Sequence, residues 1–222
     1  MMQGKAILFS EMKPNASWTN RFNHWYDTEH IPLRMAVTGF QSAQRYKAID
    51  SEAYLAVYEM ESAEVLAAPA YQKVKTQPSD ETKWMLANVK DFTRYTCKQL
   101  SQFDRGEAFG LGATFLYAVW FTVPDDRLQD FDNWYEKDHI PLLMECEDWL
   151  MVRRFEVISG EPKPYNRLAL HYLRDISALD GPARAKARAT PWRARLAAES
   201  WFKGEYSVFN RQGSRQIGLT DK

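Results

Sequence analysis

Two short groups of side chains have the residue types and spacing of general acid–base catalysts. Each group contains a histidine, an acid three residues before it and a tyrosine four residues before it: Tyr26, Asp27 and His30, then Tyr135, Glu136 and His139. Imidazole titrates near neutral pH, and residues three or four apart share one face of a helix. The carboxylate could therefore fix the histidine tautomer and raise its basicity, while the phenol exchanges a proton with a substrate. The structural alternative is that each histidine caps the end of its helix.

A proline follows each histidine by two residues, at Pro32 and Pro141. Because the residue before a proline resists the α conformation, the sequence predicts that each helix ends there. A short second helical piece is expected over residues 33–37. Each histidine would then lie in the last turn of its helix, where the helix dipole favours the protonated ring.

Five further residues are candidates for substrate binding. Arg34 lies four residues beyond His30 and could bind an anionic substrate if the helix resumes past the proline. In the second half, His171 replaces Tyr58 on a predicted strand, where it either points into a pocket or packs in the core. The aromatic content of 14% fits well-filled cores or a pocket for a flat, apolar ligand. The full set is Arg34, Trp25, Trp134, His171 and Tyr58.

Two other sets of charged residues have open interpretations. Glu29 and Asp138 directly precede the histidines, and neighbours on a helix point about 100° apart. We therefore expect them to bind other partners, such as a backbone amide or the arginines Arg45 and Arg154. The basic run over residues 184–195 is either a solvated helix face or a site that recognises a carboxylate or phosphate on the substrate.

The histidine groups belong to a repeat that spans nearly the whole chain. His139 follows His30 by 109 residues, and the same offset continues through three further pairs: Met35 and Met144, Phe40 and Trp149, Arg45 and Arg154. After a longer loop in the second copy the offset becomes 113, as in Pro69 and Pro182. Chance does not align so many bulky and charged positions, so the sequence predicts two similar units.

The elements in each unit follow the order βαββαβ. In the first unit, residues 5–11, 40–49, 53–60 and 92–100 read as strands, with helices around the histidine group, over 62–75 and over 80–89. This order predicts a ferredoxin-like α+β unit at 1–100 and another at 113–212, with a linker at 101–112 and a polar tail at 213–222. Each four-stranded sheet leaves one face bare, so we expect the tandem units to form one intramolecular α/β barrel.

Composition narrows the class of function. The 222 residues carry a net charge of zero, which gives no global attraction to nucleic acid or to an anionic membrane. The start of the chain is not typical of a signal peptide, and the two cysteines are expected to be free thiols in a cytoplasmic protein. His24 and His30 fall on different helix faces, which argues against a metal pair. Without a phosphate-binding or dinucleotide motif, the sequence favours a reaction that uses no cofactor and no metal.

The repeated pattern Trp-Tyr-x-x-acid-His-Ile-Pro-Leu resembles the dimeric α/β-barrel superfamily, and in particular its EthD-like group. In the first copy Gly39-Phe40 completes the pattern, whereas the second copy has Asp148-Trp149. For this reason, and because of Arg34, the sequence slightly favours the first half as the working site. The resemblance implies small-molecule chemistry without selecting a reaction.

The sequence thus predicts a cofactor-independent lyase or isomerase that acts on a small aromatic or apolar oxygenated compound in catabolism. A cofactor-free monooxygenase of the same fold, and a non-catalytic ligand-binding or stress-response module, are the alternatives. The expected partner is a small molecule, with no nucleic acid and no membrane, and a homodimer is possible beyond the intramolecular barrel.

Overall fold

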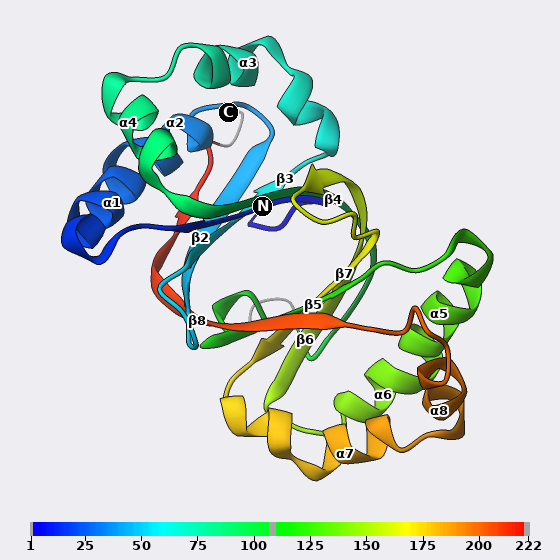
Figure 1. The fold of residues 1–222 in the computed structure, drawn as a ribbon. Coiled ribbons are helices and arrows are strands. Elements are labelled where there is room, and N and C mark those ends of the chain that lie inside the picture. Colours follow the sequence, from blue (N-terminus) through cyan, green and yellow to red (C-terminus); the bar gives the residue numbers. More distant parts are fainter. Residues whose placement is uncertain (1, 107–109, 220–222) are drawn as a thin grey trace. The chain divides into compact units, whose positions relative to one another are not determined.

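The computed structural model describes residues 2–106 and 110–219. Two βαββαβ units follow one another along the chain (Figure 1), which confirms the predicted duplication. The elements of the first unit are β1 Ala6–Lys13, α1 Thr19–Trp25, α2 Ile31–Met35, β2 Phe40–Ala48, β3 Tyr54–Met60, α3 Pro69–Thr76, α4 Asp80–Asn88 and β4 Lys90–Asp104. Those of the second are β5 Phe115–Phe121, α5 Leu128–Trp134, α6 Ile140–Leu143, β6 Trp149–Glu161, β7 Arg167–Leu173, α7 Pro182–Arg188, α8 Pro191–Ala197 and β8 Glu205–Ile217.

The strands are antiparallel and share one pairing scheme in both units. β1 pairs with β3 and β4, and β2 pairs with β3. Likewise β5 pairs with β7 and β8, and β6 pairs with β7. The hydrogen-bonded order β1-β3-β2-β8-β5-β7-β6-β4 is that of a closed eight-stranded barrel, so the predicted fold class is confirmed.

Three strands are longer than the sequence suggested. β4 continues to Asp104 and β8 to Ile217, so residues 101–104 of the expected linker and 213–217 of the expected tail are strand. Backbone hydrogen bonds explain the extension, because the amide of Arg105 donates to Leu150 and that of Gly218 donates to Gln41. β6 likewise runs on to Glu161. Residues 107–109 of the linker, 220–222 of the tail and Met1 lie outside the described residues.

Each unit has its own apolar core. Side chains alternate along the strands, and one face of each sheet packs on the helices of its unit. In β5 the core-facing positions are Tyr117, Val119 and Phe121, and in β1 the corresponding residues include Leu8 and Met12. Both cysteines are free thiols. Among the described residues, no helix is long and apolar enough to cross a membrane.

The prediction that the histidine-bearing helix ends before proline is wrong in both units. A π-helical turn at Tyr26–His30 joins α1 directly to α2, and the turn Tyr135–His139 joins α5 to α6. In the first turn, the amide of Ile31 donates to the carbonyl of Tyr26 five residues back. The wider turn accommodates a proline in the next position without ending the helix. Neither histidine therefore lies in a last helical turn.

Candidate functional site

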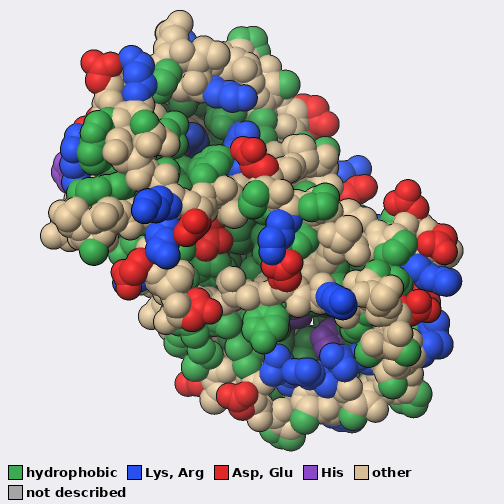
Figure 2. Space-filling view, in the orientation of Figure 1, with side chains coloured by type: hydrophobic (Ala, Val, Ile, Leu, Met, Phe, Trp, Pro, Cys, Tyr) green, Lys and Arg blue, Asp and Glu red, His purple; other side chains and the backbone are tan. Residues whose placement is uncertain are grey.

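A cavity of about 230 Å³ opens in the second unit between the sheet and the helices. We call it the second-half pocket. Strands β5, β6 and β7 form its floor, and the π-helical turn together with α7 and α8 borders its helical side. Figure 2 shows it as a hollow in which purple histidine atoms lie beneath blue Lys and Arg side chains. The polar residues that define its chemistry are Tyr135, His139, His171, Arg184, Arg188 and Arg193.

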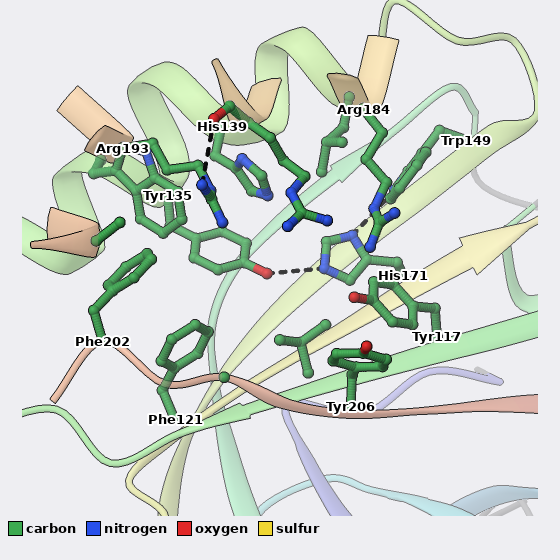
Figure 3. Close-up of a pocket in the computed structure, with 16 residues that line it drawn as sticks. Tyr117, Phe121, Tyr135, His139, Trp149, His171, Arg184, Arg193, Phe202 and Tyr206 are labelled. Atoms are coloured by element: carbon green, nitrogen blue, oxygen red, sulfur yellow. Dashed lines mark hydrogen bonds between the residues drawn. The ribbon is translucent and has the colours of Figure 1, made fainter. Parts of the chain in front are cut away.

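Three side chains form a hydrogen-bonded chain at the floor of this pocket (Figure 3). The indole Nε1–H of Trp149 donates to Nδ1 of His171 at 3.1 Å, and Nε2 of His171 lies 2.9 Å from the hydroxyl of Tyr135. Since the indole can only donate, Nδ1 must accept, and the neutral ring then carries its hydrogen on Nε2. That hydrogen points at the Tyr135 oxygen. The phenolic hydrogen of Tyr135 is consequently left to donate to a ligand.

The protonation states at this floor follow from burial. Desolvation lowers the pKa of His171 well below its usual value, and the positive charge of nearby Arg184 and Arg154 adds to the effect. Desolvation also raises the pKa of Tyr135, although the guanidinium of Arg154 opposes the shift. Both groups are therefore neutral near pH 7, with the phenol as hydrogen-bond donor.

His139 lies beside the chain and can act as a base. Its ring packs at a tilt against Trp134 with centroids 4.7 Å apart, and its centroid lies 5.1 Å from that of the Tyr135 ring. Burial lowers its pKa to about 4, so the expectation that the helix dipole keeps it protonated is wrong. Nδ1 lies 3.4 Å from the carbonyl of Ala187, which can only accept a hydrogen. The tautomer that satisfies this contact leaves a lone pair on Nε2.

The carboxylates three residues before the histidines, Asp27 and Glu136, bind arginines and not the histidines. Asp27 accepts from Nη1 of Arg45 at 2.9 Å, and Glu136 accepts from Nη1 of Arg154 at 2.8 Å. The expectation that these carboxylates fix the imidazole tautomer is therefore wrong. Arg154 is almost fully buried, and its guanidinium also lies 4.9 Å from the centroid of the Tyr135 ring. The carboxylate thus acts on the site indirectly, by holding a cation against the phenol.

The neighbouring acids have hydroxyl partners rather than the expected amide or arginine. Oε1 of Glu29 accepts from Ser79 at 2.5 Å and from Thr82 at 2.7 Å. In the second unit Asp138 accepts from Thr190 at 2.6 Å. Ser79 and Thr190 are the N-cap residues of α4 and α8, so each acid ties the histidine turn to the start of a helix.

The corresponding space in the first unit is filled by side chains. Tyr26, His30, Tyr58 and Phe40 are each no more than 4% exposed. Arg34 adds to this packing, since its Nη1 donates to the His30 carbonyl and its guanidinium lies 5.5 Å from the Tyr58 ring centroid. Burial lowers the pKa of His30 well below its usual value, as it does for His171.

The predicted site residues therefore separate into two sets. Tyr135, His139, His171 and Trp134 line the second-half pocket, whereas their first-half counterparts form part of a buried core. Trp25 is held in that core by a hydrogen bond of 2.9 Å from its indole N–H to Thr82. The sequence slightly favoured the first half. A cavity of about 450 Å³ there touches Asp27 and Arg45 but not Tyr26 or His30, whereas the second-half pocket is lined by both Tyr135 and His139.

Sequence reasoning missed four contributors to the pocket. Trp149 was noted only as the counterpart of Phe40, and Tyr117 was not singled out. Phe202 and Tyr206 come from the end of the unit, where no motif was recognised. The available signal was that the second copy has Trp149 in place of Phe40 and His171 in place of Tyr58. These residues lie on adjacent strands, β6 and β7, and form a donor–acceptor pair.

No protein-family model matches the chain, and no curated protein matches it in sequence. Solved structures do match in fold. An anthrone oxidase-like protein has a TM-score of 0.69 at 9% identity, over 97% of this chain and 94% of its own. A proposed monooxygenase from Fusobacterium nucleatum has a TM-score of 0.63 at 10% identity, with coverage of 99% and 98%. One from Lactobacillus acidophilus has a TM-score of 0.58 at 10% identity, with 96% coverage of both chains. At these identities the likeness shows the fold alone, the ferredoxin-like α+β barrel.

Proposed function

We propose that the protein is an enzyme that moves a proton on a small aromatic or apolar oxygenated compound bound in the second-half pocket. The observation that carries this proposal is the chain from Trp149 through His171 to Tyr135, which leaves a phenolic hydrogen for the ligand. A pocket with a fixed donor and a neutral imidazole beside it is suited to general acid–base catalysis.

The roles of the two groups follow from their hydrogen bonds. A substrate carbonyl or phenol oxygen accepts the Tyr135 hydrogen, and the lone pair of His139 takes a proton from the adjacent carbon. As charge develops on the substrate oxygen, Tyr135 can transfer its proton fully. The resulting phenolate keeps the hydrogen bond from His171, and the nearby guanidinium of Arg154 stabilises it further. Return of the proton to another carbon gives an isomerase, and cleavage of a bond next to the carbonyl gives a lyase.

A cofactor-free monooxygenase is the second candidate, because two of the similar structures are described as monooxygenases and a third as anthrone oxidase-like. Its first step is the same removal of a proton. The carbanion then reacts with molecular oxygen, so that a CH₂ group and one O₂ give a C=O group and one water. The two candidates therefore differ in their use of oxygen, not in the residues that start the reaction.

Deuterium exchange tests the shared step. We would incubate the protein in D₂O, under nitrogen, with 2-tetralone, whose CH₂ between ring and carbonyl is acidic, and follow exchange by proton NMR. Enzyme-dependent exchange is expected. Anthrone in air would then test the oxygenation, with anthraquinone as product and oxygen uptake as readout. Tight binding of both probes with neither exchange nor oxidation would contradict the proposal and support a ligand-binding module.

The finer assignments rest on the sequence motif. The repeated Trp-Tyr-x-x-acid-His-Ile-Pro-Leu pattern supports placing the chain in the EthD-like group, and the aromatic pocket supports a role in the breakdown of aromatic compounds. We also propose that the protein is cytoplasmic and that its partner is a small molecule, not a nucleic acid or a membrane. Association into a homodimer stays a prediction, which light scattering after size-exclusion chromatography would test.

A further inference from the structure

Three arginines border the second-half pocket without acidic partners. Among the described residues that line this pocket none is acidic, and no ion pair involves Arg184, Arg188 or Arg193. Instead Arg184 donates to the Leu179 carbonyl at 2.6 Å, and Arg193 donates to the Arg188 carbonyl at 3.3 Å. By contrast, neighbouring basic residues on the same helices are paired, Lys186 with Glu145 and Arg195 with Asp130.

The first unit shows that the helices do not require arginine at these positions. Arg184 and Tyr71 are each the third residue of a helix that begins with proline. Arg193 and Thr82 each donate a backbone amide to the N-cap hydroxyl three residues before. In the first unit these positions hold a buried tyrosine and a buried threonine. The second unit has instead placed two guanidinium groups beside its pocket, close to His139 (Figure 3).

The same exchange leaves a buried donor without a partner. In the first unit the indole N–H of Trp25 donates to Thr82. Arg193 offers no acceptor at the equivalent place, and the Nε1–H of Trp134 has no hydrogen-bond partner among the described residues. Trp134 is 2% exposed and lines the pocket. An unsatisfied buried donor costs about 1–3 kcal/mol, so placing arginine where the first unit has Thr82 weakens the second-unit core.

The remaining walls fit a planar ring system. Tyr117, Phe121, Phe202 and Tyr206 line the side of the pocket opposite α7 and α8 (Figure 3). A dry cavity of about 150 Å³ accommodates one benzene molecule. The volume of about 230 Å³ therefore suits a ligand of one or two fused rings with a small substituent.

We propose that the second-half pocket binds an aromatic ligand with an anionic oxygen group, a carboxylate or a phosphate, held by Arg184, Arg193 and Arg188. This inference rests on the proposed function for its site and adds the substrate class. The rings lie against the tyrosines and phenylalanines, and the anion lies beneath the α7–α8 rim. Guanidinium groups bind carboxylate and phosphate oxygens in two-point geometry, which suits both anions.

Isothermal titration with matched probes tests the charge preference. We would compare 2-naphthoate with 2-naphthamide, which has the same rings and no charge, and add 2-naphthyl phosphate as the second anion. Both anions are expected to bind at least about 10-fold more tightly than the amide, and the preference should shrink as salt screens it. Arg184→Gln and Arg193→Gln should each remove most of the preference. Their controls, Lys186→Gln and Arg195→Gln on the same helices, should retain it.

Equal binding of the amide, or a preference that survives both arginine variants, would overturn the inference. Inorganic phosphate alone, tested at the same concentrations, should bind weakly. If it binds as tightly as the naphthyl phosphate, the rings contribute nothing and the aromatic part of the inference is wrong. The experiments distinguish failure of this inference from failure of the proposed function. If naphthoate binds in an arginine-dependent way but 2-tetralone shows no deuterium exchange, the proposed function is refuted and this inference stands.

Discussion

The two halves of the chain carry the same tyrosine–histidine turn, but the turns present different residues to a cavity. The second-half pocket is lined by Tyr135 and His139, whereas a first-half cavity is lined by Asp27 and Arg45 and not by Tyr26 or His30. In the first half Tyr26 and His30 are enclosed by Tyr58, Phe40 and Arg34. In the second half the equivalent turn faces a cavity of about 230 Å³. The π-helical geometry and the acid–arginine pair are common to both, so they belong to the architecture of the unit.

The difference comes from residues outside the shared motif. Four exchanges contribute to it: Phe40 to Trp149, Tyr58 to His171, Tyr71 to Arg184 and, at the matching position after the helix cap, Thr82 to Arg193. The first two create the hydrogen-bonded chain to Tyr135, and the last two supply positive charge. A repeated motif can thus be a scaffold, with its chemistry set by the strand and helix positions that face it.

The largest expected effect separates the two histidines. His139→Ala should lower the exchange rate about 100-fold or more, the usual loss for a general base. His30→Ala in the enclosed half should leave that rate within about threefold of wild type and act mainly on stability. Exchange rates would be measured beside melting temperatures, so that a loss of folded protein is not taken for a loss of chemistry. Equal rates in the two variants would contradict the assignment.

Replacing His171 by the residue at the equivalent first-half position should lower the exchange rate less than His139→Ala does. His171→Tyr copies the first-half residue, removes the N–H that supports the Tyr135 phenolate, and should slow exchange about 10- to 100-fold. The reverse variant, Tyr58→His, tests whether imidazole alone makes a site, and it should add no activity. A fast His171→Tyr enzyme would show that the hydrogen-bonded chain is only structural.

The first half should respond through stability. Thr82→Val removes the acceptor of the Trp25 indole and one donor to Glu29, and should cost about 1–3 kcal/mol of unfolding free energy. Turnover per folded molecule should not change. Urea unfolding followed by tryptophan fluorescence would measure the loss. An unchanged midpoint would mean that this hydrogen-bond network contributes nothing to the first-half core.

At neutral pH the smallest effect is expected from titration of the buried histidines, because their contribution to stability changes only below about pH 6.5. Burial lowers the pKa of His139 to about 4 in the folded protein, and the pKa of His30 and His171 is lowered too. The unfolded chain, with histidine near 6.5, therefore binds more protons below that pH. Stability should be full above pH 6.5 and fall by at most about 1.4 kcal/mol per pH unit per histidine as pH drops toward 4. A His30→Gln variant should show a shallower decline in melting temperature, and an unchanged slope would contradict the role of burial.

The repeat made much of the fold predictable. A constant offset between bulky residues revealed two units, and alternating apolar residues gave the strands. The course of the helix through Pro32 was not predictable, because the rule for the residue before a proline is only a preference. Ile31 keeps α-helical angles (φ −75°, ψ −49°) after the π-helical turn. Strand ends were missed since their partners lie far away in sequence, as for Gly218 and Gln41.

The site was predictable only in part, and for a physical reason. The histidine turn is encoded locally, so Tyr135 and His139 could be named from spacing alone. The hydrogen-bond partner of Glu136 could not be predicted from local spacing, because Arg154 lies on a strand 18 residues further along the chain. The pKa of the histidines depends on burial, which outweighs the helix dipole that spacing suggested. The positive charge of the rim arginines could not be assigned to the pocket from sequence, because the sequence does not show which faces of α7 and α8 border it.

The most direct test of the second-half site is a matched pair of tyrosine variants. Tyr135→Phe and Tyr26→Phe each remove one hydroxyl from the same turn of a different unit, and deuterium exchange into 2-tetralone would be measured for both. The hydrogen-bonded chain to His171 predicts that Tyr135→Phe lowers the rate about 100-fold or more while Tyr26→Phe exchanges like the wild type. An equal loss in both variants, or a larger loss in Tyr26→Phe, would contradict the location of the site.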